Sequence, residues 1–315
     1  MKHIKLVVAI AFLSVLTINA QEKKINFSKG TLKICSSKNF QIEGYDGKEV
    51  IIKSLHKNKI AVGKMISKGN KFSYSTDKKG TVTSTAPQAY TIARGGKTSN
   101  VFFSRIDESK KDGLKRLGKK QENQELGIYF TIEQKNGELI FKDKTEGQLM
   151  MFGNEKYSIK IPNSIKLNWD TTGCKESKNN NAPSVWYSSS ASSLSNFNGE
   201  VEISTSLNNL KLSDVTGPVS INSIGGNVTV DFDKKKPLKL YSVYTNNGFI
   251  DITMPSTSDV NVDANGAAIY SDLDFKVTSD DESDGQQHMK LKLKNGKVKM
   301  KLEAGFGTIY LRKKK

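Results

Sequence analysis

The second half of the chain carries a regular alternation of apolar residues, which limits the folds that the chain can adopt. Two apolar residues at positions i and i+2 recur, and successive pairs begin 9, 9, 9, 10, 12 and 10 residues apart. A period of two is typical of a strand with one buried face. Glycine precedes several pairs and permits a tight corner there. The pairs are Val201/Ile203, Leu210/Leu212, Val219/Ile221, Val228/Val230, Leu238/Leu240, Ile250/Ile252 and Val260/Val262.

Two all-β architectures fit this pattern. Two nine-residue steps make one coil of about 18 to 22 residues, and coils stacked at the ~4.8 Å strand spacing form a single-stranded β-helix, or β-solenoid. The alternative is an antiparallel β-sandwich, which hairpin turns such as Asn136-Gly137 favour. The spacing favours the solenoid and leaves the sandwich open.

The beginning of the chain has the pattern of a secretory signal peptide, over residues 1–20. Lys2 and Lys5 precede an apolar run that ends at Leu16, and Ala20 lies at the expected cleavage point. This run is shorter than the ~20 residues of a membrane span. We therefore expect an exported protein without a transmembrane span, located in the periplasm, on the outer cell surface or outside the cell.

The remaining chain divides by the strength of its strand pattern. Residues 21–160 form a β-rich N-terminal part, in which about 56–125 carry weak strand signals and are expected to be a variable insertion. Residues 161–315 form the repeat region.

The formal net charge of +17 comes almost entirely from lysine. Arg94, Arg105, Arg116 and Arg312 are the only arginines in the sequence. Proteins that read nucleic acids depend on the planar guanidinium group of arginine. The lysines therefore indicate solvated strand faces and loops, and no nucleic-acid partner is expected.

Four stretches together resemble a family of bacterial β-strand-repeat proteins, the candidate adhesin family, which is related to the head GIN domain. They are Phe40–Ser54, Tyr157–Trp169, Gly199–Met254 and Gly305–Arg312, in the order that the family has. The resemblance implies a β-helical or β-roll architecture without catalytic residues, and a role in adhesion or envelope organisation. It does not extend to residues 56–125.

Residues able to carry catalysis are sparse. His56 and His288 are the only histidines after the signal peptide and are far apart, so neither a zinc site nor a Ser-His-Asp triad is expected. We expect no cofactor and no enzymatic activity. The alternative is a glycan-active β-helix enzyme, which needs paired carboxylates. Two pairs at i and i+2 could supply them: Asp231/Asp233 and Asp272/Asp274.

A weak candidate for cation binding lies in the acidic stretch before Gly285. Asp280, Glu282 and Asp284 alternate as in part of a calcium loop, but the closing glutamate is absent because Leu291 occupies its position. An acidic hairpin tip is the simpler interpretation. No metal site is therefore expected.

Aromatic residues near corners are the candidates for ligand binding. Trp186 and Tyr187 lie in a polar stretch, and Tyr241, Tyr244 and Tyr270 lie near corners of the repeat. Aromatic rings stack on sugars and anchor protein contacts, although the same residues could pack in the core.

The two cysteines, Cys35 and Cys174, could form one long-range disulfide in an oxidising compartment. The sequence does not show that they meet.

We thus expect an exported, non-enzymatic adhesin or cell-envelope interaction module whose partner is a cell-surface glycan or protein. A lysine-rich envelope scaffold that binds anionic polysaccharide or lipid headgroups is a further alternative, beside the glycan-active enzyme.

Overall fold

The computed structural model describes residues 22–36, 38–55, 126–143, 156–171 and 192–315. It also describes the backbone of four short strands, which pair as β5 (Gly63–Met65) with β8 (Val101–Phe103) and β6 (Ala93–Arg94) with β7 (Lys97–Thr98). The described residues contain strands and no helix, so no helix among them could cross a bilayer. The expected signal peptide and most of the expected insertion lie outside the described residues.

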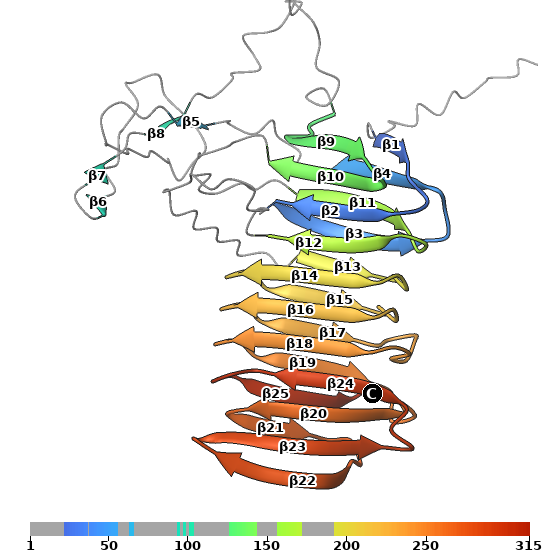
Figure 1. The fold of residues 1–315 in the computed structure, drawn as a ribbon, viewed down its shortest axis with the longest axis vertical. Coiled ribbons are helices and arrows are strands. Elements are labelled where there is room, and N and C mark those ends of the chain that lie inside the picture. The colour runs from blue at the N-terminus through green and yellow to red at the C-terminus, as the bar shows by residue number, and fades with distance from the viewer. Residues whose placement is uncertain are drawn as a thin grey trace, which may run out of the picture.

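Two large mixed sheets make up the fold (Figure 1). Sheet I has the order β1 (Glu22–Asn26), β4 (Glu49–Ser54), β11 (Lys156–Pro162), β3 (Asn39–Tyr45), β13 (Ser192–Ser195), β15 (Leu210–Ser213), β17 (Val228–Asp231), β19 (Ile250–Met254), β25 (Thr308–Lys313) and β21 (Ala268–Ser271). Sheet II has the order β22 (Lys276–Ser283), β23 (Gln286–Leu293), β20 (Val260–Gly266), β24 (Val298–Glu303), β18 (Tyr241–Asn246), β16 (Val219–Ile224), β14 (Val201–Ser206), β12 (Lys166–Asp170), β2 (Thr31–Cys35), β10 (Glu138–Asp143) and β9 (Phe130–Lys135).

Successive strands from β13 to β19 alternate between the two sheets, and strands of one sheet pair in parallel. Val201 lies opposite Val219, and Leu210 lies opposite Val228, so each of these rungs repeats after 18 residues. Antiparallel pairs occur towards both ends of the stack, for example between β9 and β10 and between β22 and β23. The nine-residue spacing thus corresponds to one strand and one corner.

One of the predicted apolar pairs is wrong. Leu238 and Leu240 are 63 % and 52 % exposed in the connection between β17 and β18, and the buried pair of β18 is Tyr241 and Val243. The pairing of Tyr241 with Val219 on β16 sets this register. The connection is therefore four residues longer than the nine-residue step predicts from Val228.

A single apolar core lies between the sheets and includes side chains from both halves of the chain. Alternation along most strands places one set of side chains inside, as in β16, where every second residue is buried. In the N-terminal half the core is aromatic: Phe40, Phe130, Phe141, Tyr157 and Trp169 are fully buried. The rings of Phe40 and Tyr157 are stacked with centroids 5.6 Å apart.

Glycine is required at the corners because neighbouring coils approach each other there. A Cβ atom at Gly217 would overlap the backbone oxygen of Gly199 on the adjacent coil, and a Cβ atom at Gly248 would overlap that of Gly226. The predicted corner glycines are thus positions of close backbone contact.

Four strands from near the two ends of the described chain lie between strands that are two apart in chain order. β24 lies between β18 and β20 in sheet II, and β25 lies between β19 and β21 in sheet I. Likewise β2 lies between β10 and β12, and β3 lies between β11 and β13. The last two strands of the chain therefore occupy the interior of the stack, and they position the surface described next.

Candidate functional site

Two exposed aromatic side chains and one half-buried one gather on the outer face of sheet I, near its β21 edge. The rings of Tyr270 on β21 and Tyr310 on β25 are stacked, with centroids 5.8 Å apart and planes 16° apart. Phe249, at the corner before β19, meets Tyr310 edge-on at 6.2 Å. Tyr270 is 60 % exposed. We call Phe249, Tyr270 and Tyr310 the aromatic platform.

Strand pairing and alternation create this platform. Ile309 and Leu311 point into the core, so Tyr310 and Arg312 between and after them point outward. Ile269 is opposite Ile309, and Tyr270 is opposite Tyr310, in the parallel pair of β21 and β25. The outward tyrosines of two adjacent strands consequently stack on each other.

A charged pair lies beside the platform. Arg312 lies 5.0 Å from the centre of the Tyr310 ring, and its Nε donates to Oδ1 and Oδ2 of Asp251 at 2.8 and 3.1 Å. The hydrogen bond to Asp251 and the charge of that carboxylate raise the pKa of the Arg312 guanidinium. The platform thus has stacking faces next to oriented hydrogen-bonding groups.

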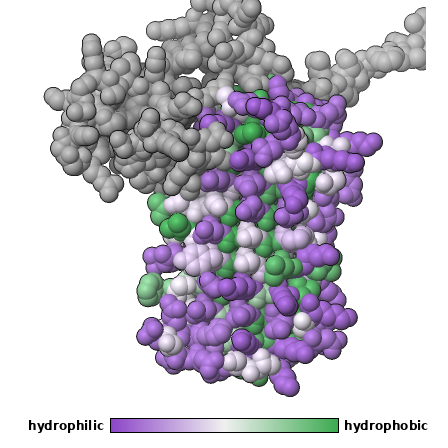
Figure 2. All heavy atoms as spheres, in the orientation of Figure 1, coloured by the Kyte–Doolittle hydropathy of each residue, from purple (hydrophilic) through white to green (hydrophobic). Residues whose placement is uncertain are grey.

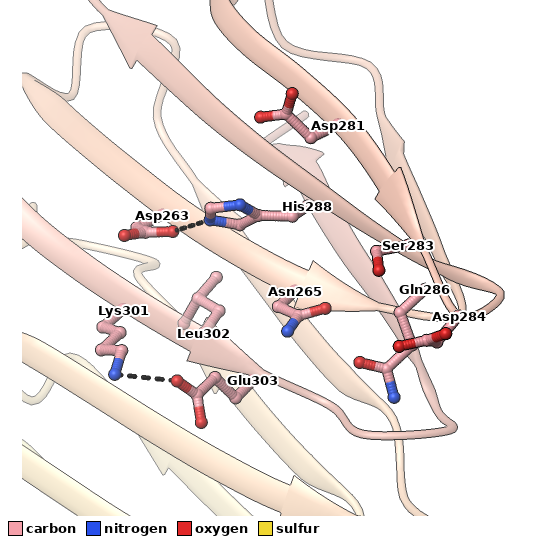
Figure 3. Close-up of a pocket in the computed structure, with 10 residues that line it drawn as sticks. All are labelled: Asp263, Asn265, Asp281, Ser283, Asp284, Gln286, His288, Lys301, Leu302 and Glu303. Atoms are coloured by element: carbon pink, nitrogen blue, oxygen red, sulfur yellow. Dashed lines mark hydrogen bonds and ion pairs between the residues drawn. The ribbon is translucent and has the colours of Figure 1, made fainter.

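Sheet II has a polar hollow of about 500 Å³ between β20, β22, β23 and β24 (Figure 3). In it, His288 Nε2 lies 2.6 Å from Asp263 Oδ1, and Lys301 Nζ lies 2.8 Å from Glu303 Oε1. The hydrogen bond to Glu303 raises the pKa of Lys301. Among the described residues, no phenylalanine, tyrosine or tryptophan lines this hollow, and its histidine and lysine have carboxylate partners.

The predicted aromatic residues lie in different places. Tyr241 is fully buried, and its hydroxyl donates to the backbone oxygen of Val215, so it is a core residue and not a surface ligand contact. Tyr270 belongs to the platform, whereas Tyr244 is 40 % exposed on sheet II. Trp186 and Tyr187 lie outside the described residues.

Sequence reasoning missed Phe249, Tyr310 and Arg312. The strand containing Tyr310 was expected, but its neighbours in the sheet were not known. Only the order β19, β25, β21 brings these side chains together with Tyr270. Alternation within residues 308–313 already indicated that Tyr310 points outward.

One carboxylate of each predicted pair contacts the end of the chain. The Lys314 ammonium contacts the side chain of Asp233, and this hydrogen bond lowers the pKa of Asp233. The backbone N–H of Lys313 donates to Asp272. Neither these two residues nor Asp231 and Asp274 line the polar hollow.

The three candidate cation ligands do not share one site. Asp284 lines the polar hollow, but Asp280 and Glu282 do not. Asp280 lies opposite Met289, and Glu282 lies opposite Gln287, in the β22–β23 hairpin. Within the described parts of the chain, no three His, Cys, Asp or Glu side chains form a metal-binding group.

Cys35 is buried at the end of β2 and is disulfide-bonded. Cys174 lies outside the described residues, so the bond between Cys35 and Cys174 stays a prediction.

Comparison with known proteins gives little guidance to function. No family model matches the chain, and no curated protein matches it. A solved structure of a proposed cell adhesion protein from Clostridium sporogenes is similar, with 12 % sequence identity and a TM-score of 0.41. The similarity covers 93 % of this chain and 99 % of the other.

Proposed function

We propose that the protein is an exported, non-enzymatic β-solenoid of adhesin type that binds a cell-surface glycan through the aromatic platform. The observation that carries this proposal is the stack of the exposed Tyr270 on Tyr310, with Arg312 and Asp251 beside it. The signal-peptide pattern supports export. The alternation of parallel strands between two sheets supports a solenoid.

The platform combines the two kinds of contact that a sugar ring needs. Aromatic faces pack against the C–H groups of a sugar, while a carboxylate and a guanidinium exchange hydrogen bonds with its hydroxyls. Arg312 and Asp251 are held in place by each other, which lowers the entropy lost on binding. A protein partner could use the same rings, but the flat stack of two tyrosines favours a sugar.

A glycan array with the full chain tests the proposal. We expect binding to a restricted set of glycans. Tyr270→Ala and Tyr310→Ala each weaken it about tenfold, because the first removes the exposed ring and the second removes the ring on which it stacks. Tyr244→Ala is the matched control, since it removes an exposed tyrosine from the other sheet. Absence of binding across the array, or equal loss in the control, contradicts the proposal.

The enzyme alternative is distinguished on the same glycan. Incubation of the bound glycan with the protein leaves its length unchanged if the protein only binds. New reducing ends that disappear in Asp231→Asn or Asp272→Asn would instead favour catalysis by the paired carboxylates.

A further inference from the structure

The connection between β17 and β18, residues 232–240, exposes lysines and leucines together. We call it the basic loop. Leu238 and Leu240 are 63 % and 52 % exposed, and Lys234, Lys236 and Lys239 are exposed beside them. Single exposed leucines are common on protein surfaces. Two exposed leucines next to exposed lysines in one loop are less usual and suggest a binding surface.

The fold holds this loop in place. Oδ1 of the buried Asp214 accepts hydrogen bonds from the backbone N–H groups of Lys234 and Lys235, both at 3.0 Å. At the two ends of the loop, the rings of Phe232 and Tyr241 meet edge-on in the core at 5.5 Å. The core contacts at the two ends of the loop and the hydrogen bonds to Asp214 thus hold the loop in the conformation that exposes the two leucines.

The end of the chain brings further cations to the same place. Lys314 contacts the side chain of Asp233 at the start of the loop, and its backbone N–H donates to the oxygen of Met254 at 2.9 Å. This contact offsets the negative charge of Asp233. The resulting surface, which we call the basic surface, combines the two leucines with Lys234, Lys236 and Lys239 of the loop. Lys313, Lys314 and Lys315 adjoin these residues through the contact of Lys314 with Asp233.

We propose that the basic surface docks on a lipid bilayer with anionic headgroups. Lysine ammonium groups near a bilayer attract anionic lipids, and apolar side chains beside them enter the boundary between headgroups and acyl chains. An anionic polysaccharide would use the lysines but gives the two leucines no apolar phase to enter. The leucines thus favour a membrane as the partner. The platform lies on sheet I and is formed by other residues, so this proposal does not depend on the proposed glycan binding.

Sedimentation with lipid vesicles tests the proposal. The full chain binds vesicles that contain phosphatidylglycerol, does not bind vesicles of phosphatidylcholine alone, and binds more weakly as salt increases. The double variants L238S/L240S and K234Q/K236Q each weaken binding by about tenfold or more. The matched controls Ile224→Ser on β16 and Lys290→Gln on β23 change exposed residues elsewhere and leave binding unchanged.

Absence of binding to the anionic vesicles would overturn the proposal, and so would two further outcomes. One is binding to the anionic vesicles that L238S/L240S leaves unchanged. The other is equally tight binding to dextran sulfate that also does not depend on the leucines, which would assign the surface to polysaccharide. Leu238→Trp supplies a second readout, because tryptophan emission shifts to shorter wavelength on entry into the bilayer, and no shift counts against docking. Tyr270→Ala should retain vesicle binding, because Tyr270 is not part of the basic surface. The glycan proposal and the membrane proposal can therefore fail independently.

Discussion

Among single residues, Tyr241 links the core to the basic loop. Its hydroxyl donates to the backbone oxygen of Val215, and burial, with the charge of Asp214 added, raises its pKa well above the ordinary value. A raised pKa means that the folded state favours the neutral phenol. The stability that this residue contributes is thus fully present below about pH 10 and is lost as the pH rises further.

Tyr241→Phe should therefore change both the stability and its pH dependence. At neutral pH we expect a loss of about 1 kcal/mol, because the oxygen of Val215 loses its donor. Above pH 10 the wild type loses stability more steeply than the variant, as measured by urea unfolding at a series of pH values. Tyr244→Phe is the control at an exposed position. Parallel pH profiles for wild type and Tyr241→Phe would contradict this account.

Among the structural elements, the corners between strands set the limit on how closely coils stack. Gly217→Ala should cost about 3 kcal/mol or more, because its Cβ overlaps the backbone of Gly199 and the coils must separate. Gly285→Ala, at the tip of the β22–β23 hairpin, is the control: its φ is +70° but no atom lies within 4 Å of the added Cβ. We expect about 1–2 kcal/mol there. Equal losses in thermal or urea unfolding would show that close approach at the corner is not the cause.

The same elements show what the sequence predicts and what it does not. Alternation and glycine spacing correctly predicted the strands that begin at Val201, Leu210, Val219 and Val228. The prediction was wrong for Leu238 and Leu240, because alternation alone does not tell which of several apolar residues faces inward. That choice depends on the neighbouring strand, since Tyr241 lies opposite Val219. Of the platform residues, only Tyr270 was predicted as a binding residue. The others lie on or next to β19 and β25, and the sequence does not show that these strands are neighbours of β21 in the sheet.

At the scale of the whole molecule, the position of the last two strands ties the stack together. β24 pairs in parallel with both β18 and β20, and β25 pairs in parallel with both β19 and β21. Strands made earlier in the chain are thus separated by strands made last. The C-terminal part of both sheets can reach its final arrangement only after residues 298–313 take their places.

Removal of residues 298–315 should therefore destabilise the strands that β24 and β25 connect to the rest of the stack. Strands β20 to β23 lose the pairings that connect them to β18 and β19, and we expect their amides to exchange hydrogen rapidly. Amides in β14 to β17 should stay protected, because their partners remain in the chain. A chain without Lys315 alone is the control. Full protection of β20 and β23 in the truncated chain would mean that these strands fold without β24 and β25. That result would contradict the conclusion that β24 and β25 must be in place before the C-terminal part of the sheets is complete.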